Sequence, residues 1–236
     1  IILCAALVLR LISLGDHSFW LDEIYSLTVA SKGLSDLIAQ QLEDTIPPLY
    51  YLFLNLWTRL FGLGEFQSRF PSLLFNLATC GLVFLFAKKY LDIRTAFFAA
   101  VLFALSPNQI YYSQEARAYS LLSLLSFLTV FSYWSAIDKN ELKHWIAFSV
   151  VTVLTLLTHL NGIFLMMGLW LYQFLFYSRR NEKTTRFLWS QLAFLFTLLI
   201  WMIGISRYLG RNAQWMEDVK AFSLFESIEF FCCTGW

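Results

Sequence analysis

The chain alternates between long apolar blocks and short polar segments, and this alternation limits its fold more than any other feature. Apolar blocks lie at about residues 70–87, 95–106, 118–137, 145–158, 161–177 and 187–205. Most of these blocks are close to the roughly 20 residues that a helix needs to cross a bilayer. The sequence therefore predicts an all-α, polytopic membrane protein.

The composition agrees with this fold and excludes other classes of protein. Hydrophobic residues make up 58% of the chain, charged residues only 14%, and the mean hydropathy is +0.61, which exceeds what a soluble core needs. The formal net charge is +1, and the 17 basic residues are scattered between apolar blocks. This pattern argues against a nucleic-acid binder and indicates that charge placement reports membrane topology.

The two ends of the sequence suggest a fragment. The first apolar run, Ile1 to Leu14, is shorter than a spanning helix, and we interpret it as a truncated membrane helix. A signal peptide is the alternative, but the run lacks a basic start and a small-residue cleavage site. The last residues, Phe231 to Trp236, carry no polar tail. We expect one transmembrane domain over residues 1–236, truncated at both ends.

The block from Ile46 to Phe61 decides the predicted topology. It is apolar but short, and it opens with Pro47 and Pro48. If it crossed the membrane, the basic segments 88–94 and 178–186 would lie outside, against the positive-inside tendency. If it lies in the interface, nine of the seventeen basic residues become cytoplasmic. We therefore expect an interfacial helix.

This topology has about seven membrane helices and a long first external loop. The loop covers residues 15–68 and holds seven acidic residues against two basic ones. It is expected to contain two interfacial helices, one near Leu21 to Gln41 and one at Pro48 to Phe61, because proline fits the first turn of a helix. A second external loop covers residues 106–117.

Charged residues that the topology does not explain gather on the predicted external side. They are the adjacent acids Asp22 and Glu23, then Arg69 at the start of the next span, and Glu115 and Arg117 in the second loop. Ionisable groups at membrane depth are costly, so they usually pair, line a wet cavity or serve a reaction. Carboxylates can act as general bases and arginines can hold a phosphate, so this set suits a phosphate-bearing substrate.

Several short motifs in a fixed order carry a family resemblance. They are Trp20-Leu21-Asp22-Glu23, Pro47-Pro48-Leu49-Tyr50-Tyr51, Phe61-Gly62, Arg69-Phe70-Pro71-Ser72, Leu105-Ser106-Pro107, Tyr112-Ser113-Gln114-Glu115-Ala116-Arg117-Ala118-Tyr119 and Thr158-His159-Leu160-Asn161-Gly162. By their order and spacing, the chain resembles the protein O-mannosyltransferase and aminoarabinose-transferase-like group of GT-C glycosyltransferases. The resemblance covers nearly the whole sequence.

The resemblance implies a transferase that takes a sugar from a dolichyl or undecaprenyl phosphate and passes it, with inversion, to an acceptor on the external face. Asp22 would be the general base, and Glu23 would be its neighbour supporting donor or acceptor. Successive helix residues point about 100° apart, so these two acids cannot be equivalent. Arg69 and Arg117 would hold the lipid phosphate, and Glu115 would face the same cavity.

The resemblance also brings in His159, Tyr112, Pro47 and Pro48 as substrate-binding candidates. The family commonly has a histidine before the Pro-Pro pair, whereas Thr45-Ile46 stand here, which separates the chain from the true protein mannosyltransferases. The Gln-Glu-Ala-Arg motif resembles prokaryotic membrane transferases. The resemblance therefore implies a prokaryotic plasma-membrane enzyme whose acceptor is a lipid, glycan or protein.

Each candidate residue also has a purely structural interpretation, in which it takes no part in a reaction. An acidic pair is favoured at a helix start by the helix dipole, and Arg69 can anchor a helix end by snorkelling. Glu115 and Arg117 can pair with each other, and His159 can serve in helix packing. His17 lies close to the acidic pair but does not complete a metal site. We expect no metal ligands, with a divalent ion at the acidic pair as the open alternative.

Two other function classes stay open. The first is a non-catalytic relative that binds lipid-linked sugar, which the sequence alone does not distinguish from an enzyme. The second is a membrane lipid or solute transporter. Transporters often show repeated halves and interrupted helices with midplane charges, and this sequence shows neither.

Overall fold

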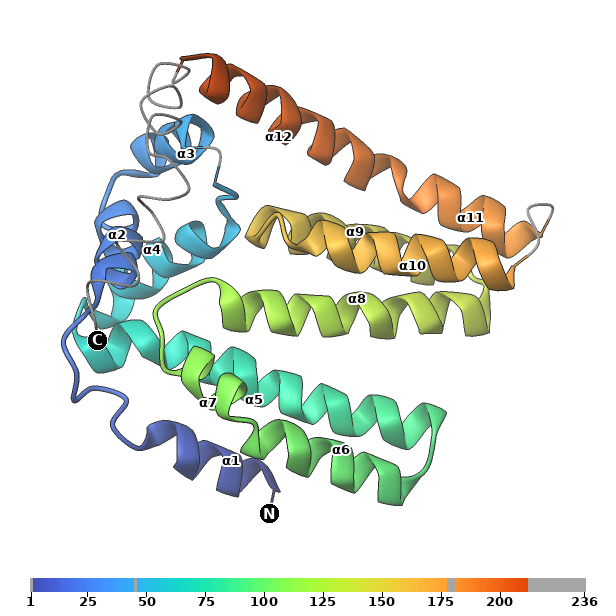
Figure 1. Cartoon of the computed structure of the whole chain (residues 1–236), viewed down its shortest axis with the longest axis horizontal. Coiled ribbons are helices and arrows are strands. Elements are labelled where there is room, and N and C mark those ends of the chain that lie inside the picture. Colours follow the sequence, from blue (N-terminus) through green and yellow to red (C-terminus); the bar gives the residue numbers. More distant parts are fainter. Residues whose placement is uncertain (1, 45, 178–180, 212–236) are drawn as a thin grey trace, which may run out of the picture.

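Every regular element in the described part of the chain, residues 2–44, 46–177 and 181–211 of the computed structural model, is a helix (Figure 1). The α-helices are α1 (Ile2–Leu11), α2 (Leu21–Ala30), α3 (Leu34–Glu43), α4 (Leu49–Phe61), α5 (Glu65–Tyr90), α6 (Ile93–Leu105), α7 (Pro107–Ser113), α8 (Tyr119–Lys139), α9 (Leu142–Thr158), α10 (Gly162–Phe176), α11 (Glu182–Ser190) and α12 (Leu192–Arg211). The predicted all-α class is confirmed.

Three stretches of the described residues are long and apolar enough to cross a membrane. These are α5, α8 and the Glu182–Tyr208 stretch of α11 and α12. The pair α6 and α7, which is bent by 59°, adds a fourth if it counts as one broken span, and α1, α9 and α10 are shorter apolar helices. The polytopic membrane class is thus confirmed, whereas the number of seven spans stays a prediction.

Polar residues and prolines set the helix ends around the turns. Asp92 starts α6 by accepting hydrogen bonds from the backbone N–H groups of Arg94 and Thr95, at 2.8 and 3.0 Å. Asn140 ends α8 in the left-handed conformation, with φ of 50°. Pro107 stands at the first turn of α7, where the chain bends away from α6. The local sequence therefore explains where several spans begin and end.

Buried polar side chains join α1 to its neighbours. Arg10 is fully buried, and its Nε donates to Asn76 Oδ1 of α5 at 2.8 Å. Its Nη1 donates to the Ala104 carbonyl of α6 at 3.0 Å. The Gln114 amide donates to the Ile12 carbonyl at 2.7 Å. These bonds hold the segment after α7 against the end of α1, beside the candidate site.

The first predicted external loop contains three helices, not two. The single helix expected near Leu21 to Gln41 is divided into α2 and α3, with a break before Gly33. Asn55 of α4 fills this break, because its amide donates to the carbonyls of Ala30 and Lys32 at 2.6 and 2.9 Å. The Ala30 carbonyl lies at the end of α2, where helix carbonyls lack partners within the helix, and the Lys32 carbonyl also accepts from Arg59. The contact joins residues far apart in the sequence, so periodicity alone did not predict the break.

Helix α4 is where the predicted interfacial helix was placed, and it is not among the helices long and apolar enough to cross a membrane. It begins at Leu49, one residue later than expected, so Pro48 precedes the helix. One face of α4 is buried through residues such as Tyr50 and Leu54, whereas Leu56 and Leu60 are exposed on the other. The span α5 begins at Glu65 and so includes the last residues of the predicted loop.

The helices of the first loop and the turns after α5 and α8 lie at opposite ends of the molecule (Figure 1). The ends of α5 and α8 at these turns carry Lys88, Lys89 and Lys139. The charged candidates Asp22, Glu23 and Arg69 belong to α2 and the start of α5, at the other end. The fold thus separates the basic turns from the candidate site, as the charge pattern predicted.

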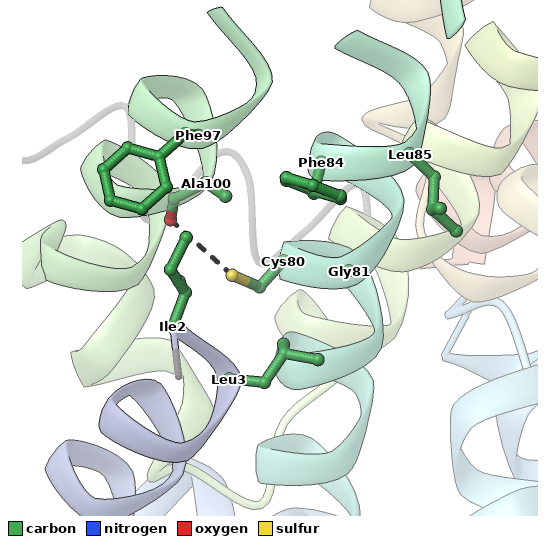
Figure 2. Close-up of a pocket in the computed structure, with 8 residues that line it drawn as sticks. All are labelled: Ile2, Leu3, Cys80, Gly81, Phe84, Leu85, Phe97 and Ala100. Atoms are coloured by element: carbon green, nitrogen blue, oxygen red, sulfur yellow. Dashed lines mark hydrogen bonds between the residues drawn. The ribbon is translucent and has the colours of Figure 1, made fainter. Parts of the chain in front are cut away.

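An apolar pocket of about 500 Å³ lies between α1, α5 and α6 (Figure 2). Its wall includes Ile2, Phe84 and Phe97, and the Cys80 thiol contacts the Ala100 carbonyl at 3.6 Å. None of the predicted site residues lines it. This pocket is therefore separate from the charged cluster.

Candidate active site

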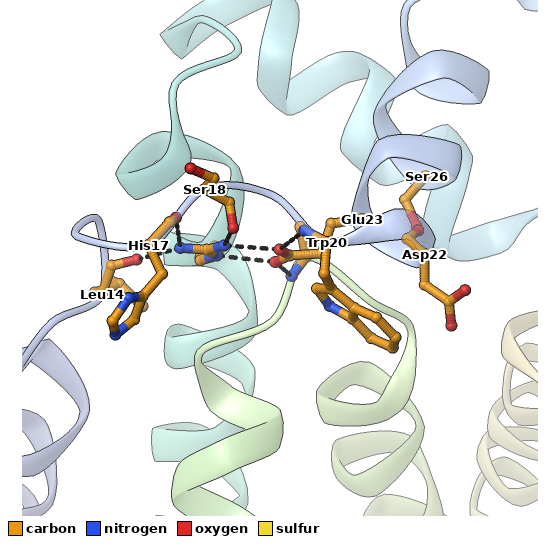
Figure 3. Close-up of polar contacts among 9 residues, drawn as sticks. Leu14, His17, Ser18, Trp20, Asp22, Glu23 and Ser26 are labelled. Carbon is orange, nitrogen blue, oxygen red and sulfur yellow. Dashed lines mark hydrogen bonds and ion pairs between the residues drawn. The ribbon is translucent and has the colours of Figure 1, made fainter. Parts of the chain in front are cut away.

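Glu23 and Arg69 form a buried, two-pronged ion pair (Figure 3). Arg69 Nε donates to Glu23 Oε1 at 2.8 Å, and Arg69 Nη2 donates to Glu23 Oε2 at 2.7 Å. Both side chains are almost completely buried. Parallel bonds of this kind are the strongest and most specific geometry for an arginine and a carboxylate. The pair fixes the start of α2 to the start of α5.

The remaining N–H groups of Arg69 bind the backbone between α1 and α2. Nη1 donates to the carbonyls of Leu14 and His17 at 3.1 and 2.9 Å, and Nη2 donates to the carbonyl of Ser18 at 3.3 Å. A guanidinium has five N–H donors, and all of those of Arg69 point at protein acceptors. The predicted phosphate contact of Arg69 therefore finds no free donor in this structure.

The Glu23 carboxylate is equally well satisfied. Besides Arg69, it accepts hydrogen bonds from the backbone N–H of Ala116 at 2.8 Å and from that of Trp20 at 3.4 Å. The Trp20 contact closes the first turn of α2, where an acidic side chain is also favoured by the helix dipole. The Ala116 contact ties the segment between α7 and α8 to the same point. Glu23 thus organises three segments and has little capacity to accept a further hydrogen bond.

Asp22 points away from this cluster (Figure 3). Its side chain is 42% exposed, and one carboxylate oxygen lies 3.4 Å from Arg117 Nη2. The prediction that the two adjacent acids cannot be equivalent is confirmed, because one is locked in a buried network and the other is accessible. The cause is the turn of about 100° per residue along a helix.

Arg117 has fewer of its N–H groups in hydrogen bonds than Arg69 has. Its Nη1 donates to the Asp22 carbonyl at 3.2 Å and to Ser26 Oγ at 3.3 Å. Its guanidinium also lies 5.8 Å from the centre of the Tyr119 ring. The Nε atom is buried without a hydrogen-bond partner, and 19% of the side chain is exposed. Arg117 is therefore the arginine with capacity for an anionic ligand.

Glu115 is a second acid close to Asp22 and Arg117. It is buried, and its Oε2 atom has no hydrogen-bond partner. Burial raises the pKa of the Glu115 carboxyl, and the nearby carboxylates of Glu23 and Asp22 raise it further, against the opposing effect of Tyr111 and Arg117. Glu115 thus keeps its proton to a higher pH than an exposed glutamate.

This raised pKa predicts a pH-dependent effect of Glu115→Gln on stability. Because the folded pKa lies above the ordinary value of 4.5, the wild type loses stability as the pH rises from the ordinary value through the folded pKa. We expect the variant to melt above the wild type at pH 7 and to show a smaller difference at pH 4.5. Thermal unfolding in detergent at both pH values measures this difference. A variant that melts lower at pH 7 would show a carboxylate stabilised in its charged form.

His159 and Tyr112 both contact Tyr119, whose ring lies beside Arg117. His159 follows α9, and its ring lies 5.9 Å from that of Tyr119. The centre of the Tyr112 ring of α7 lies 4.9 Å from the centre of the same Tyr119 ring. The structure therefore brings both predicted residues to the charged cluster.

Pro47 and Pro48 take a supporting position. They precede α4, whose Tyr51 packs edge-on against Tyr25 of α2 with ring centres 6.0 Å apart. Their fixed backbone angles suit the entry to a helix. The structure thus places them where they orient α4 against α2.

Two contributors were missed by the sequence analysis. Ser26 lies one turn after Asp22, and its Oγ accepts a hydrogen bond from Arg117 Nη1. The spacing of four residues, which places Ser26 on the same helix face as Asp22, is a sequence signal that could have revealed it. Tyr119 contacts both Arg117 and His159, but tyrosine at a membrane boundary is common and gave no distinct signal.

The charged cluster has arginines among its acids rather than a set of metal ligands. Among the described residues, no group of three or more histidine, cysteine, aspartate or glutamate side chains could hold a metal ion. His17 contributes its backbone carbonyl to Arg69. The arrangement combines an accessible carboxylate, a partly satisfied arginine and a buried carboxyl, which suits proton acceptance beside an anion.

Residues 45–205 match the model of a family described as dolichyl-phosphate-mannose-protein mannosyltransferase. The chain belongs to this family. The match includes Arg69, Glu115, Arg117 and His159 and begins after Asp22 and Glu23. The chain shows no match among curated proteins or among solved structures.

Membership of this mannosyltransferase family confirms the GT-C resemblance found in the sequence. Together with the apolar helices, it shows an integral-membrane glycosyltransferase that uses a lipid-linked sugar donor.

Proposed function

We propose that this mannosyltransferase-family protein transfers a hexose or pentose from a polyprenyl phosphate to an acceptor hydroxyl. The polyprenyl chain is undecaprenyl or dolichyl. The reaction inverts the configuration of the sugar, and Asp22 is the general base. The observation that carries this proposal is the pairing of the accessible Asp22 carboxylate with the incompletely satisfied Arg117 at 3.4 Å. A base and an anion-binding group are thereby held side by side. The acceptor is a lipid, glycan or protein.

The proposed reaction is a single displacement at the anomeric carbon. The acceptor oxygen forms a bond to that carbon as the bond from the carbon to the phosphate oxygen breaks. The acceptor proton passes to the Asp22 carboxylate, and the polyprenyl phosphate leaves as an anion that needs no proton. Asp22 suits this role because its exposed carboxylate is not saturated by hydrogen bonds, in contrast to Glu23.

Arg117 is proposed to bind the donor phosphate and to stabilise the charge that develops on it. Its free Nε–H and its exposed portion support this role. Arg69 is proposed to act as a positioning residue, because its five N–H groups hold Glu23 and the backbone before α2. Glu115, Tyr112 and His159 would complete the wall of the site.

The external face of a prokaryotic plasma membrane is the proposed location of this site. The support is the separation of the site from the basic turns, because basic residues favour the cytoplasmic side (Figure 1). An acceptor would then reach Asp22 from outside the cell.

Replacing Arg117 tests the phosphate role. A hydrogen bond to a charged group contributes about 1.5–3 kcal/mol, so Arg117→Gln should raise the KM for the donor by roughly 10–100-fold. Arg117→Lys should give a smaller increase, since lysine keeps the charge but loses the fork. The matched control is Arg59→Gln in α4, an exposed arginine of the first loop that binds the Lys32 carbonyl. This variant should leave the KM unchanged.

The assay uses the intact protein in liposomes, supplied with membrane acceptors and with undecaprenyl phosphate carrying mannose, glucose or arabinose. Mass spectrometry detects the product, and NMR spectroscopy gives its anomeric configuration. Formation of a glycosidic bond with inversion supports the proposal. A folded protein that binds these donors without transfer from any of them would instead be a non-catalytic relative, and retention of configuration would exclude the single displacement.

A further inference from the structure

Four rings from three separate elements form a continuous row beside Arg117. This ring row consists of Tyr111 and Tyr112 of α7, Tyr119 at the start of α8, and His159 after α9. The distances between successive ring centres are 5.4, 4.9 and 5.9 Å. The row therefore leads from the charged cluster across the ends of three helices.

The backbone and side chains around the ring row hold it in place. Ser120 Oγ donates to the Tyr112 carbonyl at 2.8 Å, which fixes the end of α7 against α8. The backbone N–H of Asn161 donates to His159 Nδ1 at 3.1 Å. The Arg117 guanidinium lies 5.8 Å from the Tyr119 ring centre, within reach of a cation–π contact. A surface held in this way loses little freedom when it binds a ligand.

The ring row is anchored and yet accessible. Tyr111 and Tyr112 are 57% and 38% exposed, whereas Tyr119 and His159 are half-buried. Aromatic faces carry negative charge density and offer a large apolar surface with a polar edge. Such faces suit a ligand that has both C–H and hydroxyl groups.

His159 adds a directed hydrogen-bond donor at the end of the row. Because its Nδ1 accepts the Asn161 N–H, the proton of the neutral ring is assigned to Nε2. Burial and the nearby Arg117 charge lower the pKa of His159, so the ring stays neutral at lower pH than an ordinary histidine. The Nε2–H group is thus available to a hydroxyl oxygen.

We propose that the ring row binds the sugar of the lipid-linked donor, with the C–H face of the sugar on Tyr112 and Tyr119 and a sugar hydroxyl accepting from His159 Nε2. This inference rests on the proposed phosphate role of Arg117. In the donor the sugar is bonded directly to the phosphate, so a phosphate at Arg117 places the sugar within one ring length of Tyr119. A sugar fits this combination of aromatic faces and one polar donor.

Binding of two lipids separates this proposal from an ordinary membrane-boundary role of the tyrosines. The probes are undecaprenyl phosphate carrying mannose and undecaprenyl phosphate alone, titrated against the protein in detergent. Loss of one aromatic contact, about 0.5–1.5 kcal/mol, should weaken binding of the sugar-bearing lipid by roughly 2–10-fold in Tyr112→Leu and in Tyr119→Leu. Binding of the sugar-free lipid should stay unchanged in Tyr112→Leu, whose ring contacts Tyr119. Tyr119→Leu also removes the ring beside Arg117, so Tyr112→Leu is the decisive variant.

Conservative variants distinguish the ring face from the polar edge. Tyr119→Phe keeps the ring and should bind the sugar-bearing lipid more tightly than Tyr119→Leu does. His159→Phe keeps a ring but loses the Nε2–H, and should weaken only the sugar-bearing lipid. Tyr90→Leu, at the opposite end of the molecule, is the control and should change neither affinity.

Two results would overturn the proposal. Equal weakening of both lipids by Tyr112→Leu would show that the ring row contacts the lipid or the bilayer. Unchanged binding of the sugar-bearing lipid would show that the row does not contact the sugar. If Tyr119→Leu does not fold, the partly exposed Tyr112 decides alone. Because binding is measured without transfer, failure of Asp22 as the base would leave this result standing.

Discussion

Replacing Asp22 with asparagine is expected to lower sugar transfer by about 10²–10⁴-fold, the usual contribution of a positioned general base. The amide has nearly the shape of the carboxylate but cannot accept the acceptor proton. The fold should be unaffected, because the side chain is 42% exposed and its contact with Arg117, at 3.4 Å, is weak. Initial rates of transfer in liposomes, with melting temperature as a check on folding, measure the effect.

Asp36→Asn is the matched control for this substitution. Asp36 lies in the first turn of α3 in the same loop, and its carboxylate accepts an exposed hydrogen bond from Ser35 Oγ. The same change of carboxylate to amide there should leave the rate unchanged. If Asp22→Asn kept the wild-type rate within a few-fold, another group would have to accept the proton and the proposed role of Asp22 would fail.

Replacing Glu23 with glutamine is expected to destabilise the protein strongly. The substitution leaves the Arg69 cation buried without its counter-charge, and breaking a buried pair in this way costs about 3–5 kcal/mol. For a chain of this size, that corresponds to a fall in melting temperature of roughly 6–20 °C. Thermal unfolding in detergent, followed by fluorescence or by size-exclusion chromatography of heated samples, measures the fall.

The ion pair of Glu182 and Arg186 provides the comparison. It spans one turn of α11 at 2.6 Å, with side chains 64% and 34% exposed. A surface pair contributes about 0–1 kcal/mol, so Glu182→Gln should barely change the melting temperature. The double variant Glu23→Gln with Arg69→Met should recover part of the loss, because it removes the unpaired charge. Loss of transfer by Glu23→Gln at an unchanged melting temperature would instead indicate a direct chemical role for Glu23.

The two acids therefore illustrate how adjacent residues of the same charge take different roles. Glu23 accepts four hydrogen bonds and holds α2, α5 and the segment between α7 and α8 together. Asp22 faces the opposite way and remains accessible. Positioning of the reactive group thus depends on the residue beside it, since Glu23 sets the orientation of the first turn of α2.

The membrane class and the helices followed from the sequence because they depend on local patterns. The apolar blocks near residues 70–87 and 118–137 became α5 and α8, since hydrophobic length and composition determine which segments can span a bilayer. The short length of the block that contains α4 and the charge of the turns also pointed to the observed arrangement. The division of α2 from α3 did not, because it depends on hydrogen bonds from the distant Asn55.

The sequence by itself determined that this is an all-α membrane protein of the GT-C type and which charged residues topology leaves unexplained. Only the tertiary structure separated their roles, with Arg69 saturated by protein acceptors and Arg117 keeping an unpartnered Nε. The physical reason is that each guanidinium offers the same five donors in any sequence. How many are left for a ligand depends on carbonyls and carboxylates that folding brings from distant segments.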